Sequence, residues 1–246
     1  MASLFISTEK AAIAEAVRSK LARVRDIRAA ARRAGGDRLK LREWQAGRLA
    51  GTYADLLADA RYRPAARFFL EDLYGPKDFT ERDDEVARIL PTMTRLLPTG
   101  AVRTFGLAIE LDCLSEQLDA ALIDALREGI GTGAPISIDA ARYAAAYRKC
   151  ANRTDRERQI ALVGEIGVAL DALSEKPLVA KALRMMRGPA HAAGLGALHE
   201  FLERGFLAFR HMHGASEFLA VIGRRERRIL DRLFAGEPDP FRNMGD

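Results

Sequence analysis

Residues 100–128, GAVRTFGLAIELDCLSEQLDAALIDALRE, decide the fold class of this chain. Their apolar residues recur every three or four positions, which is the period of an α-helix. The polar residues of this helix form two columns on nearly opposite sides: Arg103, Glu110, Gln117 and Asp124 in one, and Asp112, Glu116 and Asp119 in the other. A helix with one solvent face cannot expose both columns, so a central position would turn one set of carboxylates toward protein.

The same helical period continues on both sides of this stretch, and no convincing alternating strand occurs. A hydrophobic content of 48% in 246 residues is enough to form a sizeable core. We therefore expect an all-α protein, a compact bundle of about eight or nine helices. It is expected to form one domain over residues 1–236, with any subdivision near the glycine-rich loop 129–137, followed by an extended tail at 237–246.

Helix borders follow from glycine, proline and capping residues. A second helix is expected over 38–60, and a short helix is expected to end at Gly188-Pro189. A histidine-bearing helix over 191–212 follows, and Ser216 then caps a last helix that reaches Gly236.

Candidate catalytic groups come from carboxylates in apolar surroundings. Glu165 lies within IALVGEIGVALDAL, residues 160–173, and a buried carboxylate needs a partner or a proton. The candidate partners are Arg103, Arg158, His191 and His199. An interior cluster of Glu110, Glu165 and His199 would suit acid–base chemistry in a helical oxygenase-like or ferritin-like enzyme, or a small-ligand carrier. The alternative is an interhelical ion pair without chemistry.

All four histidines of the chain fall within residues 191–213. His199 and Glu203 are four residues apart and so share one helix face, which makes them weak candidates for metal ligands. Neither the H-E-x-x-H spacing of zinc proteases nor the E-x-x-H spacing of di-iron proteins is present. The sequence therefore identifies no cofactor.

Complementary charge suggests a surface for association. Residues 1–50 contain 12 Lys and Arg against 5 Asp and Glu, whereas residues 71–85 contain 2 against 7. The candidate partner-binding residues are Arg18, Arg25, Arg28 and Arg32 in the first helix, and Phe68, Phe69 and Tyr74 beside the acidic segment. The two regions could dock within one chain or between two copies.

The leading interpretation is therefore a partner-binding or self-associating module, expected as a homodimer or with another protein. Nucleic-acid binding through arginine-rich helix faces is a second alternative, supported by Arg224, Arg225, Arg227 and Arg228 in the last helix. No apolar run approaches 18 residues, and the first residues do not resemble a signal peptide, so we expect a cytoplasmic protein without membrane contact.

The segment FFLEDLYGPKDF, residues 68–79, resembles a signature of uncharacterised bacterial helical proteins of similar length. This resemblance implies kinship with such proteins and a helical fold. It implies no activity, and it transfers no catalytic residue to this chain.

Overall fold

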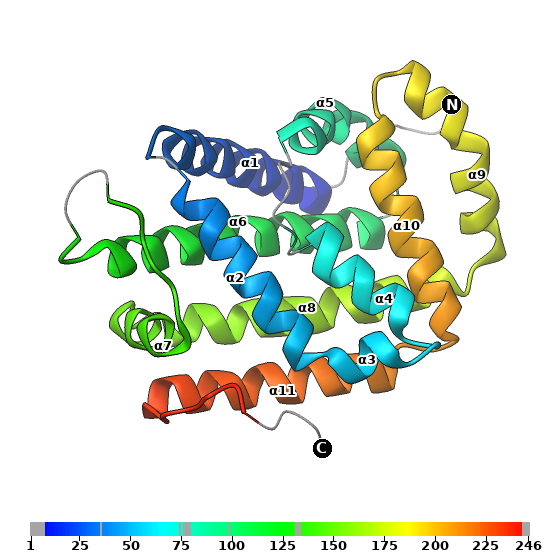
Figure 1. The fold of residues 1–246 in the computed structure, drawn as a ribbon. Coiled ribbons are helices and arrows are strands. Elements are labelled where there is room, and N and C mark those ends of the chain that lie inside the picture. Colours follow the sequence, from blue (N-terminus) through cyan, green and yellow to red (C-terminus); the bar gives the residue numbers. More distant parts are fainter. Residues whose placement is uncertain are drawn as a thin grey trace.

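The computed structural model describes residues 8–34, 36–73, 75, 80–97, 99–130 and 134–242. This part of the chain consists of helices and their connections, without a strand, as predicted (Figure 1). Its elements are α1 (Thr8–Ala34), α2 (Asp37–Thr52), α3 (Ala54–Ala58), α4 (Arg63–Phe68), the π-helical turn η1 (Phe69–Leu73), α5 (Thr80–Leu96), α6 (Thr99–Arg127), α7 (Ala140–Lys149), α8 (Arg153–Ser174), α9 (Pro177–Ala192), α10 (Gly196–Met212) and α11 (Ser216–Ala235).

The eleven α-helices of the described residues exceed the predicted number, partly because the helix expected over 38–60 is divided. The division falls at Tyr53, whose backbone angles, φ −114° and ψ 24°, are not helical. The Tyr53 hydroxyl donates a hydrogen bond to Oε1 of Glu226 at 2.7 Å. A tertiary contact with α11 therefore accompanies a break that local sequence does not signal.

The long helix α6 lies in the middle of the molecule. It packs against α1 on one side and α8 on the other, and α8 packs in turn against α11, so these helices form successive layers (Figure 1). Helix α2 also packs against α6. Residues 100–128 therefore have the central position that would turn one of their two polar columns toward protein.

Three apolar clusters form the core, and each combines distant parts of the chain. One joins α2, α3 and α4 with α10 and α11, a second joins α2 and α6 with α7 and α11, and a third joins α1, α5 and α6 with α10. The segment predicted as an extended tail contributes Phe241, which lies edge-on to Trp44 with ring centroids 5.8 Å apart. All three clusters therefore contain residues from both sides of the loop 129–137.

The predicted start of the histidine helix, at residue 191, is wrong, whereas its predicted end at residue 212 is confirmed. Helix α9 continues through Pro189 to Ala192, and α10 begins at Gly196, so His191 and His199 belong to different helices. The predicted end of the last helix at Gly236 is confirmed, since Gly236 is its left-handed C-cap with φ 76°. Ser216 is the first residue of this helix and not its cap, because the N-cap position is Ala215, without a side-chain hydrogen bond.

Candidate functional site

The most buried carboxylate of the central helix is Glu116, with a side chain 1% exposed. Three arginines converge on it: Arg28 Nε donates to Oε1 at 3.0 Å, Arg38 Nε to Oε2 at 3.0 Å, and Arg42 Nη2 to Oε1 at 2.6 Å. Burial alone would raise the pKa of Glu116, but the arginines outweigh it and lower that pKa below its usual value. Glu116 therefore stays ionised and ties α1 and α2 to α6.

Asp112 and Asp119 extend this buried cluster along α6. Arg28 Nη2 donates to Oδ1 of Asp112 at 2.8 Å, and Gln45 Nε2 donates to Oδ1 of Asp119 at 3.0 Å. Burial raises the pKa of Asp119, and the opposing effects of Arg42 and Gln45 are too small to reverse it. Of the two polar columns predicted from the sequence, the one that contains Glu116 therefore faces protein. The ion pairs of its carboxylates explain how this column can be buried.

The three candidate catalytic residues do not form one cluster in the described contacts. Glu110 binds Lys20 Nζ at 2.8 Å and Arg158 Nε at 2.9 Å, and Arg158 also binds Glu165 at 2.7 Å. Burial opposes ionisation of Glu110, but the two cations lower its pKa. Glu165 is 45% exposed, so the expectation that it is buried is wrong. Arg158 was among its predicted partners; Arg103 instead pairs with Glu9.

His199 is buried, but its contacts lie away from both carboxylates. Its Nε2 lies 2.8 Å from the carbonyl oxygen of Leu183 in α9, and its ring centroid lies 6.3 Å from that of His191. The exposed ring of His191 lies 3.3 Å from Oε1 of Glu200, and a hydrogen bond to the Arg187 carbonyl, followed by that glutamate, raises its pKa. These two histidines therefore connect α9 with α10.

The weak metal candidates, His199 and Glu203, have protein partners instead. Glu203 pairs with Arg187 of α9. In the part of the chain that the structure describes, no three His, Cys, Asp or Glu residues are arranged to hold a metal ion.

The four arginines predicted as one stripe of α1 have different environments. Arg28 is buried in the Glu116 cluster, so it is not a surface residue. Arg25 pairs with Asp84 of α5 at 2.7 Å, and Arg18 pairs with Glu15 of its own helix. Arg32 is exposed. Part of the charge complementarity expected between the first helix and the acidic segment is thus used inside one chain.

The two described aromatic candidates for partner binding do not lie at the surface. Phe68 and Phe69 are buried in the core cluster that joins α4 to α10 and α11, so they are unavailable as surface anchors. Phe68 lies against Phe201 with ring centroids 5.3 Å apart. Tyr74 lies outside the described residues.

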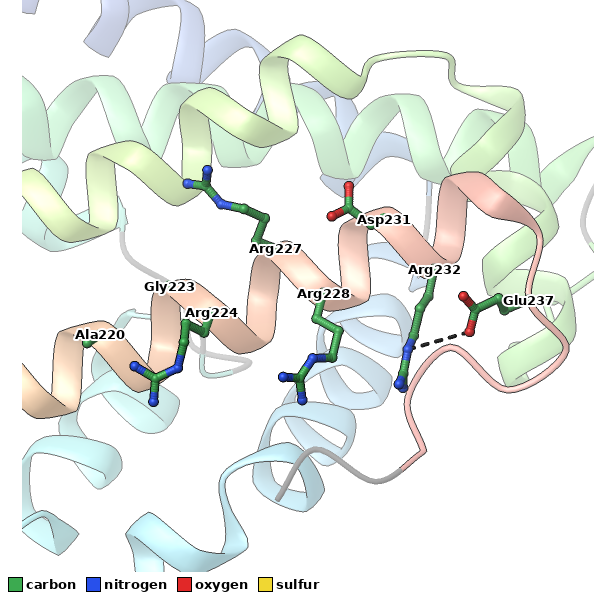
Figure 2. A pocket seen from close by; sticks show the side chains of 8 residues that line it. All are labelled: Ala220, Gly223, Arg224, Arg227, Arg228, Asp231, Arg232 and Glu237. Carbon is green, nitrogen blue, oxygen red and sulfur yellow. Dashed lines mark ion pairs between the residues drawn. The ribbon is translucent and has the colours of Figure 1, made fainter. Parts of the chain in front are cut away.

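An arginine-lined groove of about 700 Å³ lies along α11 (Figure 2). Its lining consists of Ala220, Gly223, Arg224, Arg227, Arg228, Asp231, Arg232 and Glu237, and we call it the arginine groove. Figure 2 shows Arg224, Arg228 and Arg232 on one side of α11 and Arg227 with Asp231 on the other. The i, i+4, i+8 spacing of the first set produces a ladder with steps of about 6 Å.

Ion pairs occupy only part of this groove. Arg232 Nε lies 3.5 Å from Oε2 of Glu237, and Asp231 pairs with Arg153 of α8. Arg227 and Arg228 are exposed, and no carboxylate of the described residues pairs with either. The groove therefore presents unmatched positive charge to solvent.

The sequence located this surface only in part. Of the four neighbouring arginines that it singled out, Arg225 is buried and binds Asp55 through two nitrogens, at 2.7 and 2.8 Å. Arg232 and Glu237 were not predicted as members. The spacing 224, 228, 232 was a readable signal for Arg232, because it places three arginines on one helix face.

No helix in the described ranges is long and apolar enough to cross a membrane. Comparison with family models matches residues 25–240 to "Domain of unknown function (DUF8198)", whose description assigns no activity. Neither the curated proteins nor the solved structures contain a match. Since the match covers most of the chain, this protein belongs to the DUF8198 family of unknown function.

Proposed function

We propose that this protein is a partner-binding module that holds an acidic segment of another protein in the arginine groove. One observation carries the proposal: exposed Arg227 and Arg228 have no carboxylate partner in the described part of the chain, although Arg225 and Arg232 beside them do. A concave surface with unmatched charge attracts an oppositely charged partner and speeds its association.

The spacing of the groove fits a polypeptide. Arg224, Arg228 and Arg232 project at intervals of about 6 Å along α11. Carboxylates four residues apart on a partner helix, or two apart on an extended strand, repeat at about the same distance. A carboxylate of such a partner can then bind the Arg228 guanidinium through two parallel hydrogen bonds.

Nucleic acid fits this surface less well. Asp231 and Glu237 are part of the groove lining, so a continuous phosphate backbone would pass two negative charges. The lining contains no aromatic side chain on which a base could stack. An acidic peptide can place its carboxylates selectively beside Arg227 and Arg228, which favours a protein partner.

The enzyme alternative has weaker support. Glu110 and Glu165 share Arg158, and both lie at the surface or partly exposed. His199 instead binds the Leu183 carbonyl. These contacts fit an ion pair between α6 and α8 better than a set of converging acid–base groups.

The test uses a fluorescein-labelled helical peptide in which glutamate recurs at every fourth position of an alanine-rich sequence. Its counterpart has glutamine at those positions. We expect the full-length protein to bind the glutamate peptide, with affinity falling as salt rises, and the double variant Arg227→Gln/Arg228→Gln to bind it about tenfold more weakly. Fluorescence anisotropy measures both dissociation constants.

The matched control is Arg67→Gln/Arg142→Gln, which removes the same charge from exposed arginines outside the groove. Equal weakening by both double variants would attribute binding to net charge and contradict the proposal. Tighter binding of an oligothymidylate than of the glutamate peptide, lost in Arg227→Gln/Arg228→Gln, would replace it by nucleic-acid binding. Oligomers that dissociate in that variant, seen by sedimentation velocity, would identify a second copy as the partner.

A further inference from the structure

Helix α9 exposes large apolar side chains that the fold does not use. Leu178 is 80% exposed, Met185 67% and Met186 53%. They are three of the seven exposed large hydrophobic residues found in the described chain. Figure 1 shows α9 at the outer edge of the molecule, beside α10.

The helical spacing collects these side chains on one side. Leu178, Ala182 and Met185 stand at positions i, i+4 and i+7, and Met186 adjoins them. We call these four residues the α9 strip. The less exposed residues of this helix, Val179, Ala180, Leu183 and Ala190, lie on a neighbouring face that Met186 adjoins. Leu183 contacts His199 of α10, so α9 packs through that face and leaves Leu178, Ala182 and Met185 in solvent.

The polar residues of α9 are all basic. Lys181, Arg184 and Arg187 occur in residues 177–192, and no acid does. Arg187 pairs with Glu203 of α10, whereas Lys181 and Arg184 are exposed and have no carboxylate partner in the described residues. The α9 strip is therefore bordered by free positive charge.

The basic residues beside the α9 strip determine which kind of partner fits it. A second copy docking strip to strip would bring Lys181 and Arg184 beside their own equivalents, and like charges across an interface oppose association. A membrane surface is the poorer match, because interfacial helices insert Trp, Phe or several Leu residues, and α9 has no aromatic residue and only two exposed methionines beside Leu178. Methionine is typical of protein surfaces that adapt to a partner's shape.

We infer that the α9 strip is a docking surface for an acidic amphipathic segment of another protein, a second interaction surface independent of the arginine groove. Apolar side chains of that segment pack on Leu178, Met185 and Met186, and its flanking carboxylates pair with Lys181 and Arg184. Recognition of an amphipathic helix by apolar anchors at i, i+3, i+4 and i+7 is an established mode of binding.

The experiment uses full-length protein with ¹³C-methyl methionine and two synthetic amphipathic peptides. Both peptides have leucines at the same i, i+4, i+7 positions; one has flanking glutamates and the other flanking lysines. We expect the glutamate peptide to shift the methyl resonances of Met185 and Met186 and to leave that of Met212, which is fully buried, unchanged. The lysine peptide should bind about tenfold more weakly.

Two variants assign the interaction. Met185→Gln/Met186→Gln should abolish binding of the glutamate peptide, whereas Leu39→Gln, at an exposed leucine of α2, should not. Lys181→Glu/Arg184→Glu should reverse the preference between the two peptides. The variant Arg227→Gln/Arg228→Gln should leave the Met185 and Met186 shifts unchanged, which separates this surface from the arginine groove.

Four results would overturn the inference. One is the absence of Met185 and Met186 shifts at saturating peptide, and another is equal affinity for both peptides. The third is binding to phosphatidylserine vesicles, lost in Met185→Gln/Met186→Gln, without binding to either peptide. Sedimentation velocity completes the test, because self-association that this variant abolishes would make a second copy the occupant and would also contradict the inference.

Discussion

Glu116 shows how one buried carboxylate constrains its neighbourhood. A charged group that loses water is tolerated only when close hydrogen-bonding partners replace it. Arg28, Arg38 and Arg42 provide those partners from α1 and α2. Removing the acid would leave three guanidinium groups close together in a space with little water.

We therefore expect Glu116→Gln to lower the free energy of unfolding by about 3–5 kcal/mol at pH 7, the range found when one member of a buried ion pair is removed. Urea denaturation followed by circular dichroism measures the change. Asp119→Asn is the control: burial already raises the pKa of Asp119, and asparagine keeps an oxygen for Gln45, so its effect should stay within about 1 kcal/mol. Equal losses in the two variants would contradict the central role of Glu116.

The pH dependence of this loss has a definite sign. Because folding lowers the pKa of Glu116, its stabilising contribution is present above the pKa of glutamate in the unfolded chain and disappears as pH falls through the folded pKa. The stability difference between the native protein and Glu116→Gln should therefore shrink below about pH 4.3. A constant difference from pH 7 to pH 3 would show that folding does not lower the pKa of Glu116.

At the scale of helices, local signals predict some helix ends and mispredict others. Gly236 ends α11 as predicted, because glycine adopts the left-handed C-cap conformation easily. Pro189, expected to end a helix, instead lies inside α9. Proline removes the hydrogen bond to the carbonyl of Met185, and both residues are exposed, so water can replace the missing donor.

Close helix packing at Gly205 provides a prediction at this scale. A Cβ atom there would lie 2.8 Å from Cζ of Phe68, a buried ring of α4 that has little room to move. Gly205→Ala should lower the free energy of unfolding by about 1–2 kcal/mol, because overpacking exceeds the gain in helix propensity. Gly164→Ala, in α8 with open space around its Cβ, should raise it by up to about 1 kcal/mol.

Thermal denaturation of both glycine variants separates the two effects. If both raise the midpoint temperature, α4 and α10 must be less closely packed than the contact between Gly205 and Phe68 indicates.

At the scale of the whole molecule, the core clusters connect the two sides of the loop 129–137. Trp44 of α2 stacks on Tyr143 of α7 with ring centroids 4.2 Å apart. Leu122 of α6 belongs to the same apolar cluster, together with Ile229 and Leu230 of α11. Separation at the loop would expose these residues to water.

We therefore predict that the chain unfolds as one cooperative unit. The fluorescence of Trp44, the single tryptophan, reports the contact between α2 and α7, and far-ultraviolet circular dichroism reports all helices. The two signals should give coincident urea transitions. Two separated transitions would instead support a subdivision near residues 129–137.

The sequence by itself determined the all-α class, the long helix over residues 100–128, and the end of the last helix. These depend on short-range properties: the helical period of apolar residues, capping, and the backbone freedom of glycine. The two polar columns of the central helix could also be read, since they follow from the same period. So could three of the exposed arginines of α11, Arg224, Arg227 and Arg228.

Only the tertiary structure decided which polar column faces protein. Glu110 and Glu116 occupy similar sequence contexts, but α1 and α2 deliver three arginines to Glu116, whereas Glu110 stays near the surface with Lys20 and Arg158. The tertiary structure alone also decided that Arg225 is buried beside Asp55 and that the α9 strip is exposed. The physical reason is that burial and ion pairing depend on which distant helices meet, and helical periodicity specifies the faces of a helix but not their neighbours.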